Sequence, residues 1–152
     1  MLIKNIGAKY KVPGTMDLGL KKVNKYLQEN GLKKENFVYT NSSGLTNKNL
    51  FRPKDITKIL KDVRKKYSFF PEFVASLPIS AVDGTLKSRM TVLKSGKKVR
   101  AKTGLLDRVV ALAGYVNKNE KNYVFSFSFN GKSNEKKAAR DLFDYLTETI
   151  VE

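Results

Sequence analysis

The sequence predicts an α/β (α+β) fold, in which an antiparallel sheet of about three strands is flanked by helices. Apolar residues recur at helical spacing in three segments, whereas between residues 97 and 131 their spacing is that of strands. The chain has 152 residues, of which 41% are hydrophobic, so it is long enough to bury a core. Because no repeat, low-complexity tract or linker interrupts it, we expect a single domain over residues 1–152.

The first half of the chain predicts two amphipathic helices and a short strand. Residues 17–30 place Leu20, Val23 and Leu27 on one helical face, and Gly31 ends this helix. The sequence FVYT (37–40) is a short strand, and NSSGLTNKN (41–49) is a polar loop. Pro53 suits the first turn of a second helix, whose apolar residues are Ile56, Ile59, Leu60 and Val63. Pro71 and Pro78 then bracket a short apolar turn or helix.

The second half predicts a meander and a terminal helix. Residues 98–104, 109–117 and 122–131 are expected strands, and their short separations favour antiparallel pairing. We expect the second strand to be buried on both faces and the third to place Phe125, Phe127 and Phe129 on one side. Ser133 and Asn134 form a plausible N-cap pair for a helix that lies across the sheet. The apolar face expected for this helix is Ala139, Leu142, Phe143, Leu146 and Ile150.

Composition excludes several kinds of chemistry. The chain has no cysteine and no histidine, which excludes disulfides, thiolate nucleophiles, Ser-His-Asp triads and histidine metal sites. We expect neither a metal nor another cofactor. Lysine and arginine number 30 against 14 acidic residues, for a net charge of +16. Because the lysines are spread through every segment, we interpret them as solvated faces attracted to anionic polymers or membranes, without specific nucleic-acid binding.

The apolar run at the N-terminus breaks at Lys4 and Lys9, so these residues do not form a signal peptide. No apolar stretch reaches the 18 or so residues that a membrane span needs.

Four stretches in the same order carry a resemblance to a known family. Lys102, Thr103 and Gly104 lie on an expected strand before the apolar strand VVALAGYV. Upstream are LPISAVDGTLKSRM (77–90), NSSGLTNKNLFRP (41–53) and GAKYKVPGT (7–15). Together they resemble the C-terminal part of the class C low-molecular-mass penicillin-binding proteins. These are D-alanyl-D-alanine carboxypeptidases and endopeptidases with a serine beta-lactamase-like transpeptidase fold.

The resemblance covers the last third of such an enzyme, so it implies a partial beta-lactamase-like fold. The family's nucleophile belongs to a Ser-x-x-Lys motif far upstream, and its Ser-x-Asn motif falls just before Met1. Ser95 and Ser133 each begin a Ser-x-x-Lys match, and residues 128–130 match Ser-x-Asn. We interpret all three as chance matches in a lysine-rich chain.

The resemblance also implies roles for four residues. Lys102 would place a positive charge beside the nucleophile and the substrate carboxylate, and Thr103 would offer that carboxylate a hydroxyl. Gly104 would let the peptide lie close to the strand, and the N–H of Leu105 would form one arm of the oxyanion hole.

Several positions depart from the family pattern. Leu105 stands where a threonine or serine is usual, and Asp107 and Arg108 replace a small or neutral pair. Asn41 and Ser42 stand where the family commonly has Asp and Gly. Ser80 and Ala81 stand where it commonly has Ala and Gly. These changes bear on recognition of the terminal carboxylate more than on the fold. Asp83 is expected in a turn, capping the segment that follows it.

The leading functional hypothesis is the C-terminal segment of a serine-type D-Ala-D-Ala carboxypeptidase of peptidoglycan maturation, inactive alone because the nucleophile motif is absent. Its expected partners are a peptidoglycan peptide ending in D-Ala-D-Ala, beta-lactam antibiotics once the site is complete, and an N-terminal segment or second chain that supplies the nucleophile. The expected location is the periplasm or cell envelope. The alternative is a non-catalytic module that binds anionic cell-wall polymer or a partner chain. A nucleic-acid-binding domain is the third and weakest hypothesis.

Residues 123–129 should also form an exposed apolar strand edge that is liable to pair with another chain.

Overall fold

The computed structural model describes residues 2–92, 99–119 and 121–151. Contacts within the chain divide it into two compact units, residues 1–55 and 56–152. The division falls in the first turn of helix α3 (Pro53–Lys66). The expected single domain stays a prediction.

The first unit contains α1 (Leu2–Ala8), α2 (Met16–Glu29), η1 (Lys34–Asn36), β1 (Phe37–Val38) and β2 (Leu50–Phe51). Helix α2 begins after Thr15, whose hydroxyl accepts the N–H of Leu18 at 3.2 Å. It ends as predicted at Gly31, which has a φ of +81°. The N–H groups of Gly31 and Leu32 are donated back to the last turn of the helix, at 2.8 and 3.0 Å.

The polar loop of the first unit is held by one asparagine. The Oδ1 atom of Asn49 accepts the N–H groups of Thr40 and Asn41 at 2.9 and 3.1 Å. This closes the loop between β1 and β2, which pair antiparallel through Phe37 and Phe51. The predicted strand 37–40 is therefore limited to Phe37–Val38, and its partner β2 was not predicted.

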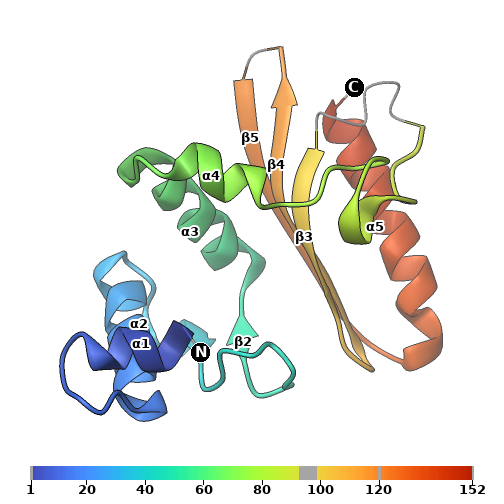
Figure 1. The fold of residues 1–152 in the computed structure, drawn as a ribbon. Helices are drawn as coiled ribbons and strands as arrows, with labels where there is room; N and C mark the ends of the chain where they lie inside the picture. The colour runs from blue at the N-terminus through green and yellow to red at the C-terminus, as the bar shows by residue number, and fades with distance from the viewer. Residues whose placement is uncertain (1, 93–98, 120, 152) are drawn as a thin grey trace. The chain divides into compact units, whose positions relative to one another are not determined.

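The second unit is built around a three-stranded antiparallel sheet in the order β3-β4-β5, as Figure 1 shows. The strands are β3 (Val99–Leu105), β4 (Val109–Lys118) and β5 (Lys121–Asn130). The helices of this unit are α3 (Pro53–Lys66), α4 (Phe70–Ala75), η2 (Gly84–Leu86), η4 (Ser133–Glu135) and α5 (Lys136–Val151). This confirms the predicted antiparallel sheet with flanking helices. Lys98, at the start of the first predicted strand, lies outside the described residues.

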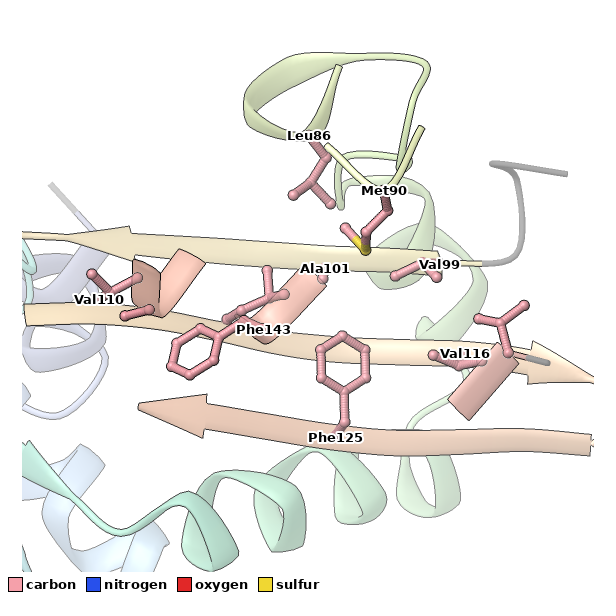
Figure 2. Packing of buried hydrophobic residues seen from close by; sticks show 11 residues of the cluster. Leu86, Met90, Val99, Ala101, Val110, Val116, Phe125 and Phe143 are labelled. Carbon is pink, nitrogen blue, oxygen red and sulfur yellow. The ribbon is translucent and has the colours of Figure 1, made fainter. Parts of the chain in front are cut away.

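The core lies between one face of the sheet and α5. Figure 2 shows Val99 and Ala101 from β3, Val110 and Val116 from β4 and Phe125 from β5 around Phe143 of α5. Leu86 and Met90 close the same core. Phe127 stacks on Phe143 with ring centroids 5.3 Å apart, so the predicted phenylalanine face of β5 is confirmed.

Two burial predictions are wrong in detail. Leu142 of α5 is 52% exposed, whereas Thr147 is buried, because its hydroxyl donates to the Phe143 carbonyl at 2.7 Å and leaves no unpaired polar atom. Strand β4 is buried on the core face from Val110 to Val116, but on its other face Val109, Ala111 and Ala113 are only half-buried.

The other face of the sheet packs on α3 and α4 through Tyr115. Its ring makes edge contacts with Phe70 and Phe73, at centroid distances of 5.3 and 6.4 Å. Its hydroxyl donates to the Leu60 carbonyl at 2.8 Å. The two faces of the sheet are thus covered by different helices (Figure 1).

Strand β5 pairs with β4 alone among the described strands. The open edge predicted for residues 123–129 is confirmed, while pairing with another chain stays a prediction. In the part of the chain that the structure describes, no helix has both the length and the hydropathy to cross a bilayer.

Candidate active site

The Lys102-Thr103-Gly104 sequence lies on β3, at the edge of the sheet. These residues and Leu105 pair with β4 from Ala113 back to Val110. Successive residues of a strand direct their N–H and C=O groups to opposite sides. The direction of each group along β3 therefore decides what the open edge offers.

Three hydrogen bonds establish that direction. The N–H of Ala101 is donated to the Pro78 carbonyl at 3.1 Å, and the Val99 carbonyl accepts the Ser80 N–H at 3.1 Å, both on the side away from β4. The N–H of Leu106 is donated to the Val109 carbonyl at 3.0 Å, toward β4. By alternation, the N–H and C=O groups of Thr103 and Leu105 point to the outer edge. Pro78 to Ser80 cover this edge only as far as Ala101.

The Lys102 ammonium reaches the same edge. Its Nζ atom donates to the Thr103 carbonyl at 2.7 Å, and that carbonyl points away from β4. The positive charge and the outward N–H of Leu105 are thus on one edge of one strand.

Thr103 faces the core side of the sheet, where it contacts the segment before β3. Its hydroxyl lies 3.0 Å from the hydroxyl of Thr85 in η2. The turn before η2 is held by Asp83, whose Oδ1 atom accepts the N–H of Ile79 at 2.7 Å. Asp83 lies in a turn as predicted, but its carboxylate holds the preceding residues and does not cap the following ones.

Glycine is not required by packing at position 104. An added Cβ there would lie 3.2 Å from the Ala111 Cβ, which a small shift accommodates. At Gly114, by contrast, an added Cβ would collide with the Arg100 carbonyl on the neighbouring strand.

A cavity of about 190 Å³ opens beside this edge. Its lining includes Thr85, Thr103 and Leu105, together with Arg89 and Arg140. Arg89 is 5% exposed and pairs with Asp144 of α5, with Nη2 2.7 Å from Oδ1. This buried pair joins α5 to the segment that carries Thr85.

Basic side chains also lower the pKa of a carboxylate on α5. The hydrogen bond from Lys137 is the main cause that holds the pKa of Asp141 below its usual value, and the charges of Arg140 and Arg89 add to it. Within the described ranges there is no cluster of His, Cys, Asp or Glu side chains that could hold a metal ion.

Of the serines in the chance motifs, those that the structure describes are not brought to this edge. The hydroxyl of Ser133 donates to Asp107 Oδ1 at 2.6 Å, at the hairpin between β3 and β4. Ser133 therefore begins η4 without capping α5, and the N-cap prediction is wrong. Residues 128–130 lie on β5, and Ser95 lies outside the described residues.

Sequence reasoning did not identify Thr85, Arg89 and Arg140 as neighbours of the motif. Thr85 and Arg89 belong to the stretch 77–90 that carried the resemblance, which was a usable signal. Arg140 had none, because it comes from a helix 35 positions after Leu105 in the chain.

Comparison with known proteins finds relatives over most of the chain. The model of the D-Ala-D-Ala carboxypeptidase 3 (S13) family matches residues 1–150. The chain is 34% identical over 109 residues to D-alanyl-D-alanine carboxypeptidase DacB of Haemophilus influenzae, covering 70% of this chain and 22% of that protein. It is 34% identical over 138 residues to the D-alanyl-D-alanine carboxypeptidase of Actinomadura sp. strain R39, covering 88% of this chain and 26% of that one. The chain therefore spans about a quarter of the length of these relatives.

Solved structures show the same fold. Penicillin-binding protein 4 (dacB) of H. influenzae, complexed with a beta-lactam, has a TM-score of 0.79 at 27% identity, over 99% of this chain and 37% of that one. A predatory endopeptidase of Bdellovibrio bacteriovorus has a TM-score of 0.72 at 16% identity, over 99% of this chain and 42% of that one, and shows a shared fold alone. The family model, the relatives and the fold agree, and the chain belongs to the D-Ala-D-Ala carboxypeptidase 3 (S13) family.

Proposed function

We propose that this chain is the C-terminal part of a serine-type D-Ala-D-Ala carboxypeptidase and supplies one wall of its active site. A Ser-x-x-Lys segment outside these 152 residues provides the nucleophile. The substrate is a peptidoglycan peptide ending in D-Ala-D-Ala, and the setting is the periplasm or cell envelope. The 152 residues alone do not hydrolyse this substrate, because removing the nucleophile removes most of the rate.

The open edge of β3 is the observation that carries this proposal. Lys102 Nζ, 2.7 Å from the Thr103 carbonyl, lies on the side of the strand to which the Leu105 N–H points. An extended peptide that pairs with this edge meets a hydrogen-bond donor and a positive charge together. Both groups stabilise negative charge on a carbonyl oxygen or a carboxylate.

The reaction needs these groups in sequence. The lysine of the Ser-x-x-Lys segment takes the proton of the serine hydroxyl and later passes it to the leaving nitrogen. The serine oxygen attacks the carbonyl carbon of the D-Ala-D-Ala bond, and the oxygen of that carbonyl becomes negative. The Leu105 N–H and the serine's own N–H bind this oxyanion. The C–N bond then breaks, D-alanine leaves with a proton on its nitrogen, and water hydrolyses the acyl-enzyme. Lys102 contributes a fixed positive charge, Thr103 a hydroxyl for the terminal carboxylate, and Gly104 a surface without a side chain for the peptide.

Labelling with a fluorescent penicillin tests the proposal, because beta-lactams acylate the same serine. The chain is tested alone and after mixing with the polypeptide encoded immediately upstream, and release of D-alanine from a D-Ala-D-Ala peptide is measured in parallel. We expect label and release only in the mixture, with both lost in Lys102→Ala.

The matched control is Lys121→Ala, which removes an exposed lysine from β5 of the same sheet and should retain both activities. No label in the mixture contradicts the proposal and favours the non-catalytic binding module. Label on the isolated chain would instead indicate that Ser95 or Ser133 is the serine that penicillin acylates.

A further inference from the structure

The cavity beside β3 combines positive, hydroxyl and apolar groups. Arg140 comes from the second turn of α5, and Thr85 and Thr103 contribute their hydroxyls. Leu105 and Val110 form apolar wall. At about 190 Å³ the cavity is large enough for an alanine-sized end group.

Arg140 holds the available charge in this cavity. Arg89 is neutralised by Asp144, to which it donates from both Nε and Nη2 at 2.7 to 3.2 Å. The guanidinium of Arg140 has no hydrogen bond or ion pair within the described ranges, and only its backbone carbonyl is held, by Arg89 Nη2 at 3.5 Å. Its five donors are therefore free to bind an anion.

The two threonines leave a further donor. Each hydroxyl has one hydrogen, and the contact of 3.0 Å between Thr85 and Thr103 uses one of the two. The other hydrogen remains available to a ligand. Leu105 is 57% exposed and brings no hydroxyl of its own, so the polar groups of the cavity are these threonines and the arginine.

We propose that Arg140 is a specificity-determining residue, which binds the terminal carboxylate of the substrate in this cavity and supplies the recognition that Leu105 lacks. The carboxylate accepts from the Arg140 guanidinium and from one threonine hydroxyl, and the methyl group of the terminal alanine contacts Leu105 and Val110. This inference rests on the proposed function, and it names the end of the substrate that this chain selects.

Titration of the 152-residue chain with N-acetyl-D-alanyl-D-alanine and with its C-terminal amide tests the inference. Backbone amide shifts in NMR spectra report binding at Thr103 and Leu105 and show that each variant is folded. We expect the acid to bind about tenfold more tightly than the amide, since a charge-assisted pair adds to a neutral hydrogen bond. Arg140→Gln should reduce the difference to about twofold or less. Arg140→Lys should keep part of it, because lysine keeps the charge but not the planar fork.

Lys137→Gln is the matched control, since it removes the same charge one turn earlier on α5 and does not line the cavity. It should keep the full preference for the acid. Retention of the preference in Arg140→Gln overturns the inference and leaves the proposed function standing. Equal binding of acid and amide by the unmodified chain also overturns it. Penicillin carries a carboxylate of its own, so the labelling experiment uses the unmodified chain, which keeps Arg140, and decides the proposed function separately.

Discussion

Replacing Arg89 by methionine tests how α5 is tied to the segment that carries Thr85. Arg89 and Asp144 have side-chain exposures of 5% and 19%, and their shortest contact is 2.7 Å. Methionine has a similar length and no charge, so Arg89→Met leaves the carboxylate of Asp144 in a mostly buried place without its partner.

The expected cost follows from this burial. Removing one member of a buried ion pair costs about 3–5 kcal/mol, because the other charge stays in the interior. Water reaches part of the Asp144 carboxylate, so we expect Arg89→Met to lower the free energy of unfolding by about 2–4 kcal/mol. The double variant Arg89→Met/Asp144→Leu removes both charges, and its cost should be below about 1 kcal/mol.

Urea unfolding followed by far-UV circular dichroism measures these free energies, since the chain has no tryptophan. A double-mutant cycle should give a coupling energy of about 2 kcal/mol or more. A loss below about 1 kcal/mol in Arg89→Met, the range of exposed pairs, would refute the reasoning. So would a double variant as unstable as the sum of the single ones.

Two further predictions concern residues outside the ion pair. Ala81 has a φ of +58°, a region that costs a non-glycine residue about 1–2 kcal/mol. The greater unfolded-state freedom of glycine offsets about 0.4–1 kcal/mol of this, so Ala81→Gly should raise the free energy of unfolding by about 0.5–1 kcal/mol. Ala138→Gly in α5 is the control, and in the same urea experiment it should lower the free energy of unfolding by about 0.5–1 kcal/mol. A lower free energy of unfolding in both variants would contradict the assignment of strain to Ala81. Burial raises the pKa of Tyr115 to about 12, since the packed face disfavours the charged phenolate, and the nearby charge of Arg64 opposes part of this shift. The stability from this group is complete below about pH 10 and is lost as the pH rises toward 12. Tyr115→Phe should therefore flatten the decline of the free energy of unfolding over this pH range. Ultraviolet absorbance that shows all seven tyrosines titrating together near pH 10 would contradict this.

The elements were predictable where local periodicity and turn chemistry act alone. Gly31 ends α2 with a positive φ, as its position after the amphipathic segment indicated. The alternation of Phe125, Phe127 and Phe129 predicted the buried face of β5, because side chains alternate across any strand. On α5 the same approach chose Leu142 where the structure buries Thr147. The apolar face of an amphipathic helix is wide, and the packing of the helix on the sheet decides which residues at the edges of that face are buried.

The site was predictable only as a list of residues. Lys102, Thr103, Gly104 and Leu105 were found through a short motif and its neighbours, and their catalytic roles stay predictions. The pattern could not say which of their backbone groups face β4, because that depends on the pairing register. Nor could it bring Thr85 and Arg140 beside Thr103, since these residues are 18 and 37 positions away in the chain.

The sequence by itself determined the amphipathic helices α2, α3 and α5, the antiparallel meander, the family resemblance and the absence of histidine and cysteine chemistry. These depend on residue types and spacings that act over a few positions. The tertiary structure decided that the Leu105 N–H and the Lys102 ammonium share the open edge of β3, and that Arg140 of α5 lines the cavity next to it. Strand register and helix packing join residues that are distant in the chain, and no local pattern in the sequence records those contacts.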